Sequence, residues 1–195
     1  MIALLVLVFS YFVGAIPVGV IIARKFYNLD IREHGSKNSG ATNVWRVLGA
    51  RPGATTLALD ALKGAVAVIA ARLLCPGELG VQVACGIAAI AGHNWSVFLK
   101  GRGGKGVATS AGVFLALMPF HALIAIAVFA LALYYTRHVS IGSMAAAVAL
   151  IISTFVLPTP GFFQGLAVLA SLMCLVKHVP NMQRLSRGEE PKVNF

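Results

Sequence analysis

Charged residues are scarce in this chain, at 11% of 195 residues, whereas soluble domains carry about 25%. Hydrophobic residues instead make up 58% of the sequence. No Gly/Ser-rich or Pro-rich linker and no low-complexity tract interrupts the chain. This composition excludes an ordinary soluble domain and predicts an all-α integral membrane protein, folded as a single multi-pass domain over residues 1–195.

Acidic residues and cysteines are few as well. Six Asp and Glu stand against 16 Lys and Arg, a formal net charge of +10. The excess of cations fits either positive-inside topology with anionic lipid or an anionic substrate. Cys75, Cys85 and Cys174 lack metal-ligand spacing, and the apolar segments lack paired carboxylates. We therefore expect no disulfide, metal or cofactor. Basic helix faces with interleaved aromatics are missing too, so we expect no nucleic acid partner.

Several enzyme signatures are absent. A Walker A loop is excluded because Leu99 stands six residues before Lys105 and Gly106 follows it. The His-x4-Asp signature of acyl-CoA acyltransferases is missing, since Phe98 and Ser39 occupy the Asp positions after His93 and His34. The sequence contains neither a G-x-S-x-G elbow nor the Asp-rich motif of CDP-alcohol transferases. An NTPase, a serine lipase and these two transferase classes are thereby disfavoured.

Long apolar stretches are what the sequence has instead. They cover residues 2–23, 53–74, 80–98, 107–118, 120–136, 140–157 and 161–177. The region 107–135 reads either as one helix kinked at Pro119 or as two helices that turn at "MPFH". Two helices give seven spans and place nearly all Lys and Arg on the inner side, as the positive-inside rule requires. We therefore expect a compact bundle of seven transmembrane helices, with the N-terminus outside and the C-terminus cytoplasmic. The stretch 107–118 is shorter than the ~20 residues that usually cross a bilayer.

The segment 33–53, "EHGSKNSGATNVWRVLGARPG", is dense in small polar residues and cations. Short hydroxyls, amides and backbone N–H groups freed by glycine can surround an anion. A short helix that begins near Thr42 would turn its N-terminus toward the same anion. The alternative is an ordinary loop capped by Ser and Asn. The candidate binding residues are Ser36, Lys37, Asn38, Thr42, Asn43 and Arg46.

A second polar segment, "GHNWSVFLKGRGGKGVATS" at 92–110, combines glycines with cations. Gly103, Gly104 and Gly106 permit close approach of the backbone to a ligand, and Lys105 supplies charge. "VATSAG" then begins a helix whose free N–H groups face the loop. His93 is a ligand, a base or a hydrogen-bonding residue at a helix end, and the last is the commonest role for a lone histidine.

The third polar segment is "VKHVPNMQRLSRGEE" at 176–190. Lys177, His178 and Asn181 can share one helix-end face, and the alternative is a charged amphipathic tail on the lipid surface. Ser143 lies at another cytoplasmic helix N-terminus. Asp60 and Lys63, three residues apart in the second span, are either functional intramembrane charges or a self-neutralising pair.

The pieces "GSKNSGATNVWR", "LDALKG", "GHNWSVFLKGRGGKGVAT" and "KHVPNMQRLSRGEE" together resemble the acyl-phosphate-dependent glycerol-3-phosphate acyltransferases of bacterial membranes. The resemblance implies transfer of an acyl group from acyl phosphate to the 1-hydroxyl of glycerol 3-phosphate, which gives lysophosphatidic acid and phosphate. The expected topology places all three polar segments on the cytoplasmic face, and the resemblance implies that the membrane is the bacterial inner membrane. Both substrates carry phosphate, so the protein needs mainly to position them and neutralise charge.

On this reading Ser36, Arg46 and Lys105 neutralise charge as the carbonyl is attacked. Lys177, His178 and Asn181 orient glycerol 3-phosphate. Either His178 or His93 takes the hydroxyl proton, or an oxygen of the acyl phosphate does. We favour the substrate oxygen. We expect a monomer in contact with membrane lipid.

Two rival classes remain open from the residues alone. An organic-phosphate transporter also combines glycine-broken helices with basic loops, but its site usually lies near the midplane between internal repeats. A scaffold protein leaves the glycine and cation clusters unexplained.

Overall fold

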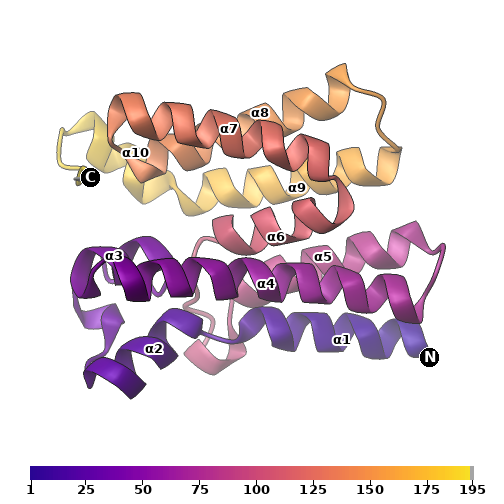
Figure 1. The fold of residues 1–195 in the computed structure, drawn as a ribbon, viewed down its shortest axis with the longest axis horizontal. Coiled ribbons are helices and arrows are strands. Elements are labelled where there is room, and N and C mark those ends of the chain that lie inside the picture. Colours follow the sequence, from indigo (N-terminus) through magenta and orange to yellow (C-terminus); the bar gives the residue numbers. More distant parts are fainter. Residues whose placement is uncertain (194–195) are drawn as a thin grey trace. The chain divides into compact units, whose positions relative to one another are not determined.

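A computed structural model describes residues 1–193, which form helices and connecting loops without a strand. The α-helices are α1 (Ile2–Ala15), α2 (Val18–Tyr27), α3 (Ala41–Leu48), α4 (Ala50–Leu74), α5 (Leu79–Asn94), α6 (Val107–Leu117), α7 (Pro119–Thr136), α8 (Val139–Val156), α9 (Gly161–Lys177) and α10 (Val179–Ser186) (Figure 1). Two single 3-10 turns, η1 (Ile31–Glu33) and η2 (Val97–Leu99), lie in the polar segments. The all-α prediction is confirmed for the described residues.

The apolar stretches match the observed helices closely, with two differences. The stretch 80–98 is helical only as far as Asn94, where α5 ends, and η2 follows it. The stretch 2–23 was expected to be continuous, but it divides into α1 and α2 with a bend of 43°. Pro17 lies at the break and precedes the first residue of α2. Proline lacks an N–H and clashes with the preceding turn, which accounts for the interruption. Further along, α6 ends at Leu117 and α7 begins at Pro119, so this region consists of two helices rather than one.

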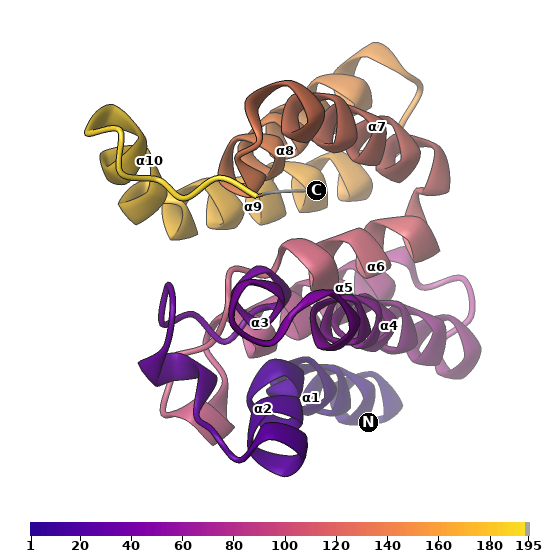
Figure 2. The same cartoon turned by 60° about the vertical axis from the view of Figure 1, so that its left-hand side comes forward.

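The chain forms two compact units, and the first covers Met1–Ala116. Within it α4 packs against α1, α3 and α5, and α1 packs against α5 (Figures 1 and 2). Glycines bring these helices into backbone contact. A Cβ added at Gly14 would lie 2.1 Å from the Ala89 carbonyl oxygen, and one at Gly92 would lie 2.2 Å from that of Tyr11. Small residues at helix contacts are typical of packing in membranes.

The second unit starts at Leu117. In it α7 packs against α8, and α8 packs against α9. The Ser171 hydroxyl donates to the Ala147 carbonyl at 2.9 Å and links α9 to α8. The short helix α10 follows α9 after a bend of 49°.

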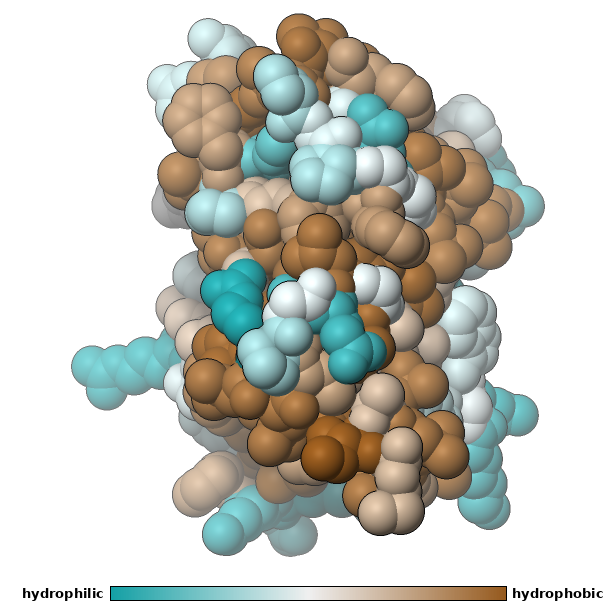
Figure 3. Space-filling model, turned by 90° about the vertical axis from the view of Figure 1, so that its right-hand side faces the viewer, coloured by the Kyte–Doolittle hydropathy of each residue, from teal (hydrophilic) through white to brown (hydrophobic). Residues whose placement is uncertain are grey.

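Apolar side chains cover much of the surface. Figure 3 shows one face on which hydrophobic residues predominate and hydrophilic ones form small patches. By length and composition α7 and α8 each suffice to cross a membrane, and the bent pairs α1–α2 and α9–α10 also qualify if each pair counts as one span. Such helices and such a surface suit a lipid environment rather than water.

Candidate functional site

The first polar segment is a loop of residues 28–40, here called the amide-rich loop, which ends at the N-terminus of α3. The Asn43 side chain, 2% exposed, lies at its centre. Its amide nitrogen donates to the carbonyls of Ile31, His34 and Asn38 at 2.9–3.0 Å. Its amide oxygen accepts the Ser36 N–H at 2.8 Å. Asn43, predicted as a phosphate ligand, thus holds the loop together, and its contact with substrate stays a prediction.

The start of the same loop is fixed by charge. Asp30 accepts hydrogen bonds from the side chains of Arg24 and Arg32, with the shortest N–O distance at 2.6 Å in each pair. Its carboxylate also accepts the Arg32 N–H at 3.0 Å and so caps η1. The hydrogen bond from the Arg32 side chain, reinforced by Arg24, holds the pKa of the Asp30 carboxyl far below its usual range.

Four predicted ligands on this segment face outward. Ser36 and Lys37 on the loop and Thr42 and Arg46 on α3 are all exposed. Thr42 and Arg46 stand four residues apart, so they share one face of the helix. The buried Asn43 therefore maintains the backbone while its exposed neighbours are available to an anion.

The second polar segment contains the glycine loop, residues 100–106, which packs on the end of α5. The Gly104 N–H donates to the His93 carbonyl at 3.0 Å. A Cβ at Gly103 would lie 2.0 Å from that carbonyl oxygen, and one at Gly104 would lie 2.2 Å from His93 Nε2. Gly106 has φ +81° and rests against the Asn94 side chain. These positions have no room for a side chain, which accounts for the run of glycines.

A small hydrophobic core connects the first two polar segments with α2. Leu99 of η2 is buried with Ile31, Val44 and Val20. Leu99 follows Val44 by 55 residues, so the first two polar segments, which are distant in sequence, pack together in this unit. Lys105 of the glycine loop is half-buried. The start of α6 at Val107 directly follows the glycine loop, as the sequence predicts.

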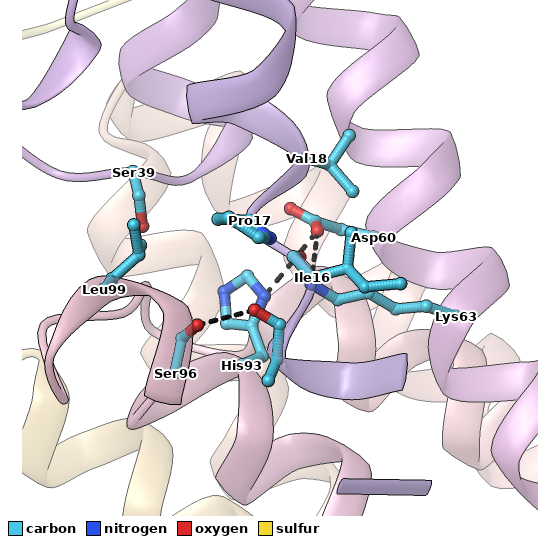
Figure 4. Close-up of a pocket in the computed structure, with 10 residues that line it drawn as sticks. Ile16, Pro17, Val18, Ser39, Asp60, Lys63, His93, Ser96 and Leu99 are labelled. Carbon is cyan, nitrogen blue, oxygen red and sulfur yellow. Dashed lines mark hydrogen bonds and ion pairs between the residues drawn. The ribbon is translucent and has the colours of Figure 1, made fainter. Parts of the chain in front are cut away.

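Beneath these loops lies a buried charge cluster (Figure 4). Lys63 Nζ lies 2.8 Å from Asp60 Oδ1, and His93 Nδ1 lies 3.6 Å from the same oxygen. Lys63 also donates to the carbonyl of Ile16, at the break between α1 and α2, at 2.8 Å. The ion pair that the three-residue spacing of Asp60 and Lys63 allows is present, which leaves both of its alternatives open, and its link to His93 and to the helix break was not predicted. A small cavity borders this cluster, lined also by Ser39, Ser96 and Leu99.

In the second unit the described tail folds back through Glu190. Asn181 Nδ2 donates to Glu190 Oε1 at 2.6 Å, and Arg184 Nε donates to Oε2 at 2.7 Å. Burial alone would raise the pKa of Glu190, but hydrogen bonds from Asn181 and Arg184 outweigh it and hold the pKa below its usual range. The Val193 N–H donates to the Arg137 carbonyl at 2.8 Å. Sequence reasoning missed Glu190, although its spacing of six residues from Arg184 within a basic tail was visible.

His178, 2% exposed, lies at the junction of α9 and α10. Its Nδ1 is 2.8 Å from the Cys174 carbonyl oxygen. Since a carbonyl only accepts, Nδ1 carries the proton, and in a neutral ring Nε2 is the acceptor. Asn181 and Ser143 are also buried in this unit, and Lys177 is half-buried. The Ser143 hydroxyl donates to the Val139 carbonyl at 2.9 Å.

No group of three or more His, Cys, Asp or Glu side chains within residues 1–193 is placed to hold a metal ion. What the first unit offers is an all-helical membrane scaffold with two loops rich in glycine, amide and hydroxyl groups and bordered by cations. Such loops bind phosphate-type anions. The fold and these loops together define the class: an integral membrane protein with candidate anion sites.

Comparison with known proteins identifies the family within this class. The model of the glycerol-3-phosphate acyltransferase family matches residues 4–188. The glycerol-3-phosphate acyltransferase of Fusobacterium nucleatum is 44% identical over 191 residues, 97% of each chain. That of Syntrophotalea carbinolica is 45% identical over 187 residues, 95% of each chain.

Solved structures agree with these relatives. A crystal structure of PlsY, described as an integral membrane glycerol 3-phosphate acyltransferase in its glycerol 3-phosphate form, superposes with a TM-score of 0.93 at 34% identity, covering 98% of this chain and 96% of that one. Its lysophosphatidic acid form gives a TM-score of 0.90 at 33% identity, with 98% and 95% covered. The chain belongs to the glycerol-3-phosphate acyltransferase family and is a membrane protein.

Proposed function

We propose that this protein transfers a fatty acyl group from acyl phosphate to the 1-hydroxyl of glycerol 3-phosphate. The acceptor oxygen forms an ester bond with the acyl carbonyl carbon, the bond from that carbon to the phosphate oxygen breaks, and the hydroxyl proton leaves with the phosphate. The products are lysophosphatidic acid and inorganic phosphate. The related PlsY was crystallised in glycerol 3-phosphate and lysophosphatidic acid forms, which supports this acceptor and product.

The proposal rests on a difference in burial among the polar side chains of the two loops of the first unit. Asn43 and His93 are buried and engaged with the loop backbones, whereas Ser36, Arg46 and Lys105 are exposed or half-buried. These three side chains are therefore assigned to charge neutralisation at the reacting carbonyl. The peptides of Gly103 and Gly106, with Lys37, Asn38 and Thr42, are assigned to substrate phosphate. Gly104, whose N–H donates to the His93 carbonyl, and Asn43 are assigned to holding the two loops in place.

In the second unit, Lys177, His178, Asn181 and Ser143 are assigned to the binding and orientation of glycerol 3-phosphate. The hydrogen bond from His178 Nδ1 to the Cys174 carbonyl fixes the orientation of the ring, and in the neutral ring it leaves Nε2 as the acceptor. We assign the proton transfer to an oxygen of the acyl phosphate, so His178 orients the hydroxyl and is not the base. A ten-thousand-fold loss of turnover in His178→Ala at unchanged substrate affinity would reverse this assignment.

We further infer a single multi-pass domain in the bacterial inner membrane, with seven spans, an external N-terminus and a cytoplasmic site. The cations of both loops in the first unit support a cytoplasmic face, because positive residues are retained inside. Cysteines introduced at Lys37 and Gly77 in intact cells should differ in labelling by an impermeant reagent, with Gly77 reacting and Lys37 protected. The reverse pattern contradicts the topology.

Turnover by purified protein tests the function directly. Labelled glycerol 3-phosphate is supplied without added metal, and palmitoyl phosphate and palmitoyl-CoA are offered in parallel. We expect lysophosphatidate and inorganic phosphate from acyl phosphate alone. Product from palmitoyl-CoA alone contradicts the proposed donor, and flux of glycerol 3-phosphate into sealed vesicles without product identifies a transporter.

A further inference from the structure

The glycine loop rests on one residue of α5. His93 accepts the Gly104 N–H through its carbonyl at 3.0 Å. Its imidazole lies so close to Gly104 that an added Cβ would be 2.2 Å from Nε2. The backbone and the ring of His93 therefore both determine where the Gly103–Gly104 peptides lie.

The opposite edge of the same ring faces the charge cluster. His93 Nδ1 is 3.6 Å from Asp60 Oδ1, and this oxygen is also the partner of Lys63 at 2.8 Å. Asp60 and Lys63 are 2% and 6% exposed, so water has little access to these contacts. Lys63 continues to the Ile16 carbonyl at 2.8 Å. One chain of polar contacts thus extends from the break between α1 and α2, through α4, to the ring that supports the loop (Figure 4).

A contribution to stability does not by itself explain the buried ion pair of Asp60 and Lys63. Moving two charges out of water costs free energy, and apolar residues of similar volume often replace a buried ion pair without loss of stability. In a membrane the cost of intramembrane charges makes a functional role the default expectation. The geometry identifies that role, because the carboxylate contacts the ring and the ring contacts the loop.

We propose that Asp60 and Lys63 are positioning residues for the glycine loop. Asp60 fixes the orientation of the His93 imidazole, Lys63 fixes the carboxylate of Asp60, and the fixed ring holds the Gly103–Gly106 peptides in place to bind a phosphate group. The inference rests on the proposed function only in taking this loop as a phosphate-binding element. A misplacement of about 1 Å in an active site costs about 100-fold in rate. Because the displaced peptides would also bind phosphate less tightly, loss of the ring's support should raise KM for glycerol 3-phosphate or acyl phosphate by about ten-fold or more.

Two charge-free variants that differ in a single group test this role. Asp60→Leu/Lys63→Met removes both charges and every acceptor toward His93. Asp60→Asn/Lys63→Met also removes both charges but retains a side-chain oxygen where Asp60 Oδ1 lies. The measurements are kcat, KM for each substrate, and the rise in thermal unfolding midpoint produced by glycerol 3-phosphate and by inorganic phosphate.

We expect both variants to fold. In the Leu/Met variant KM for a phosphate substrate should rise at least ten-fold and the stabilisation by phosphate should fall, whereas the Asn/Met variant should recover most of both effects. Adding His93→Phe to the Leu/Met variant should cost nothing further, because residues that act through one another are not additive. Wild-type KM in the Leu/Met variant, equal impairment of both variants, or an additive effect of His93→Phe would each overturn the proposal.

A further variant keeps the test decisive if the Leu/Met variant does not fold. Gly104→Ala places a Cβ at the His93 ring and should raise the same KM, whereas an unchanged KM overturns the proposal. Arg72→Met is the control, since Arg72 lies on the same helix and donates to the Ala116 carbonyl at 2.6 Å, away from the loop. It should lower the unfolding midpoint and leave KM unchanged. If the wild-type protein makes no lysophosphatidate, the proposed function fails, while stabilisation by inorganic phosphate still reports on the positioning role.

Discussion

Replacement of Asn43 by alanine should open the amide-rich loop without unfolding the rest of the first unit. The two amide hydrogens and the amide oxygen of Asn43 make at least three hydrogen bonds to the loop backbone. At about 1 kcal/mol for each buried hydrogen bond, their loss amounts to about 3 kcal/mol. Because the Ser36 N–H loses its acceptor, local opening of the loop should become roughly 100-fold more frequent.

Hydrogen exchange measured by mass spectrometry on peptides that cover residues 31–43 provides the assay. In Asn43→Ala, exchange of the Ser36 amide should accelerate roughly 100-fold, while α5 keeps its wild-type protection from exchange. Asn38→Ala is the matched control, since it removes a single bond, from the Gly40 N–H at 2.9 Å, and should have about one third of the effect in kcal/mol. Unchanged exchange in Asn43→Ala would refute the central role assigned to this side chain.

Three further results are expected. Lys105→Ala should lower turnover by about 100-fold or more, because it removes a charged donor, and near-normal turnover would end its assignment. Glu190→Gln should cost about 2 kcal/mol of stability at neutral pH. The folded pKa of Glu190 is lowered, so the extra stability of the wild type over Glu190→Gln should be present above the unfolded pKa of about 4.3. It should disappear as the pH falls through the folded pKa. Thermal unfolding of both proteins from pH 7 to about 3 tests this, and a difference in midpoint that does not change with pH contradicts it. Gly112→Ala should destabilise the first unit, because its Cβ would lie 1.8 Å from the Ala61 carbonyl oxygen. Gly165→Ala is the control, since nothing lies within 4 Å of a Cβ at that position. Equal thermal unfolding midpoints for the two variants would show that α4 and α6 do not need this close contact.

Hydropathy was sufficient to place most helices. A membrane helix is apolar on both its lipid-exposed and its buried face, so its composition alone distinguishes it from the polar loops. The stretch 161–177 matches α9 to the residue, and the turn at "MPFH" separates α6 from α7 as the charge distribution indicated. The break at Pro17 was missed, because proline is tolerated in transmembrane helices whenever other groups satisfy the freed backbone. Those groups, Lys63 and Ser96, are far away in sequence.

The polar residues were recognisable as a set, but their individual roles were not. Small polar residues near cations predict an anion site in general, and the sequence does not distinguish an amide that contacts a ligand from one that supports the loop, as Asn43 does. The role of His93 was left among three alternatives, because its contact with Asp60 depends on how α4 and α5 pack. Local spacing revealed the Asp60–Lys63 pair, since residues three apart on a helix are neighbours.

The break between α1 and α2 also constrains the order in which the protein can be completed. The Ile16 carbonyl accepts a hydrogen bond from Lys63, 47 residues later, and the Ala15 carbonyl accepts one at 2.6 Å from the Ser96 hydroxyl, 81 residues later. Unpaired backbone groups are costly in a bilayer. Within the N-terminal helices the Ile16 carbonyl also accepts the Val18 N–H at 3.1 Å, but Lys63 and Ser96 are synthesised later. The hydrogen bonds from Lys63 and Ser96, which tie the break to the rest of the first unit, therefore form only after residue 96 has been synthesised.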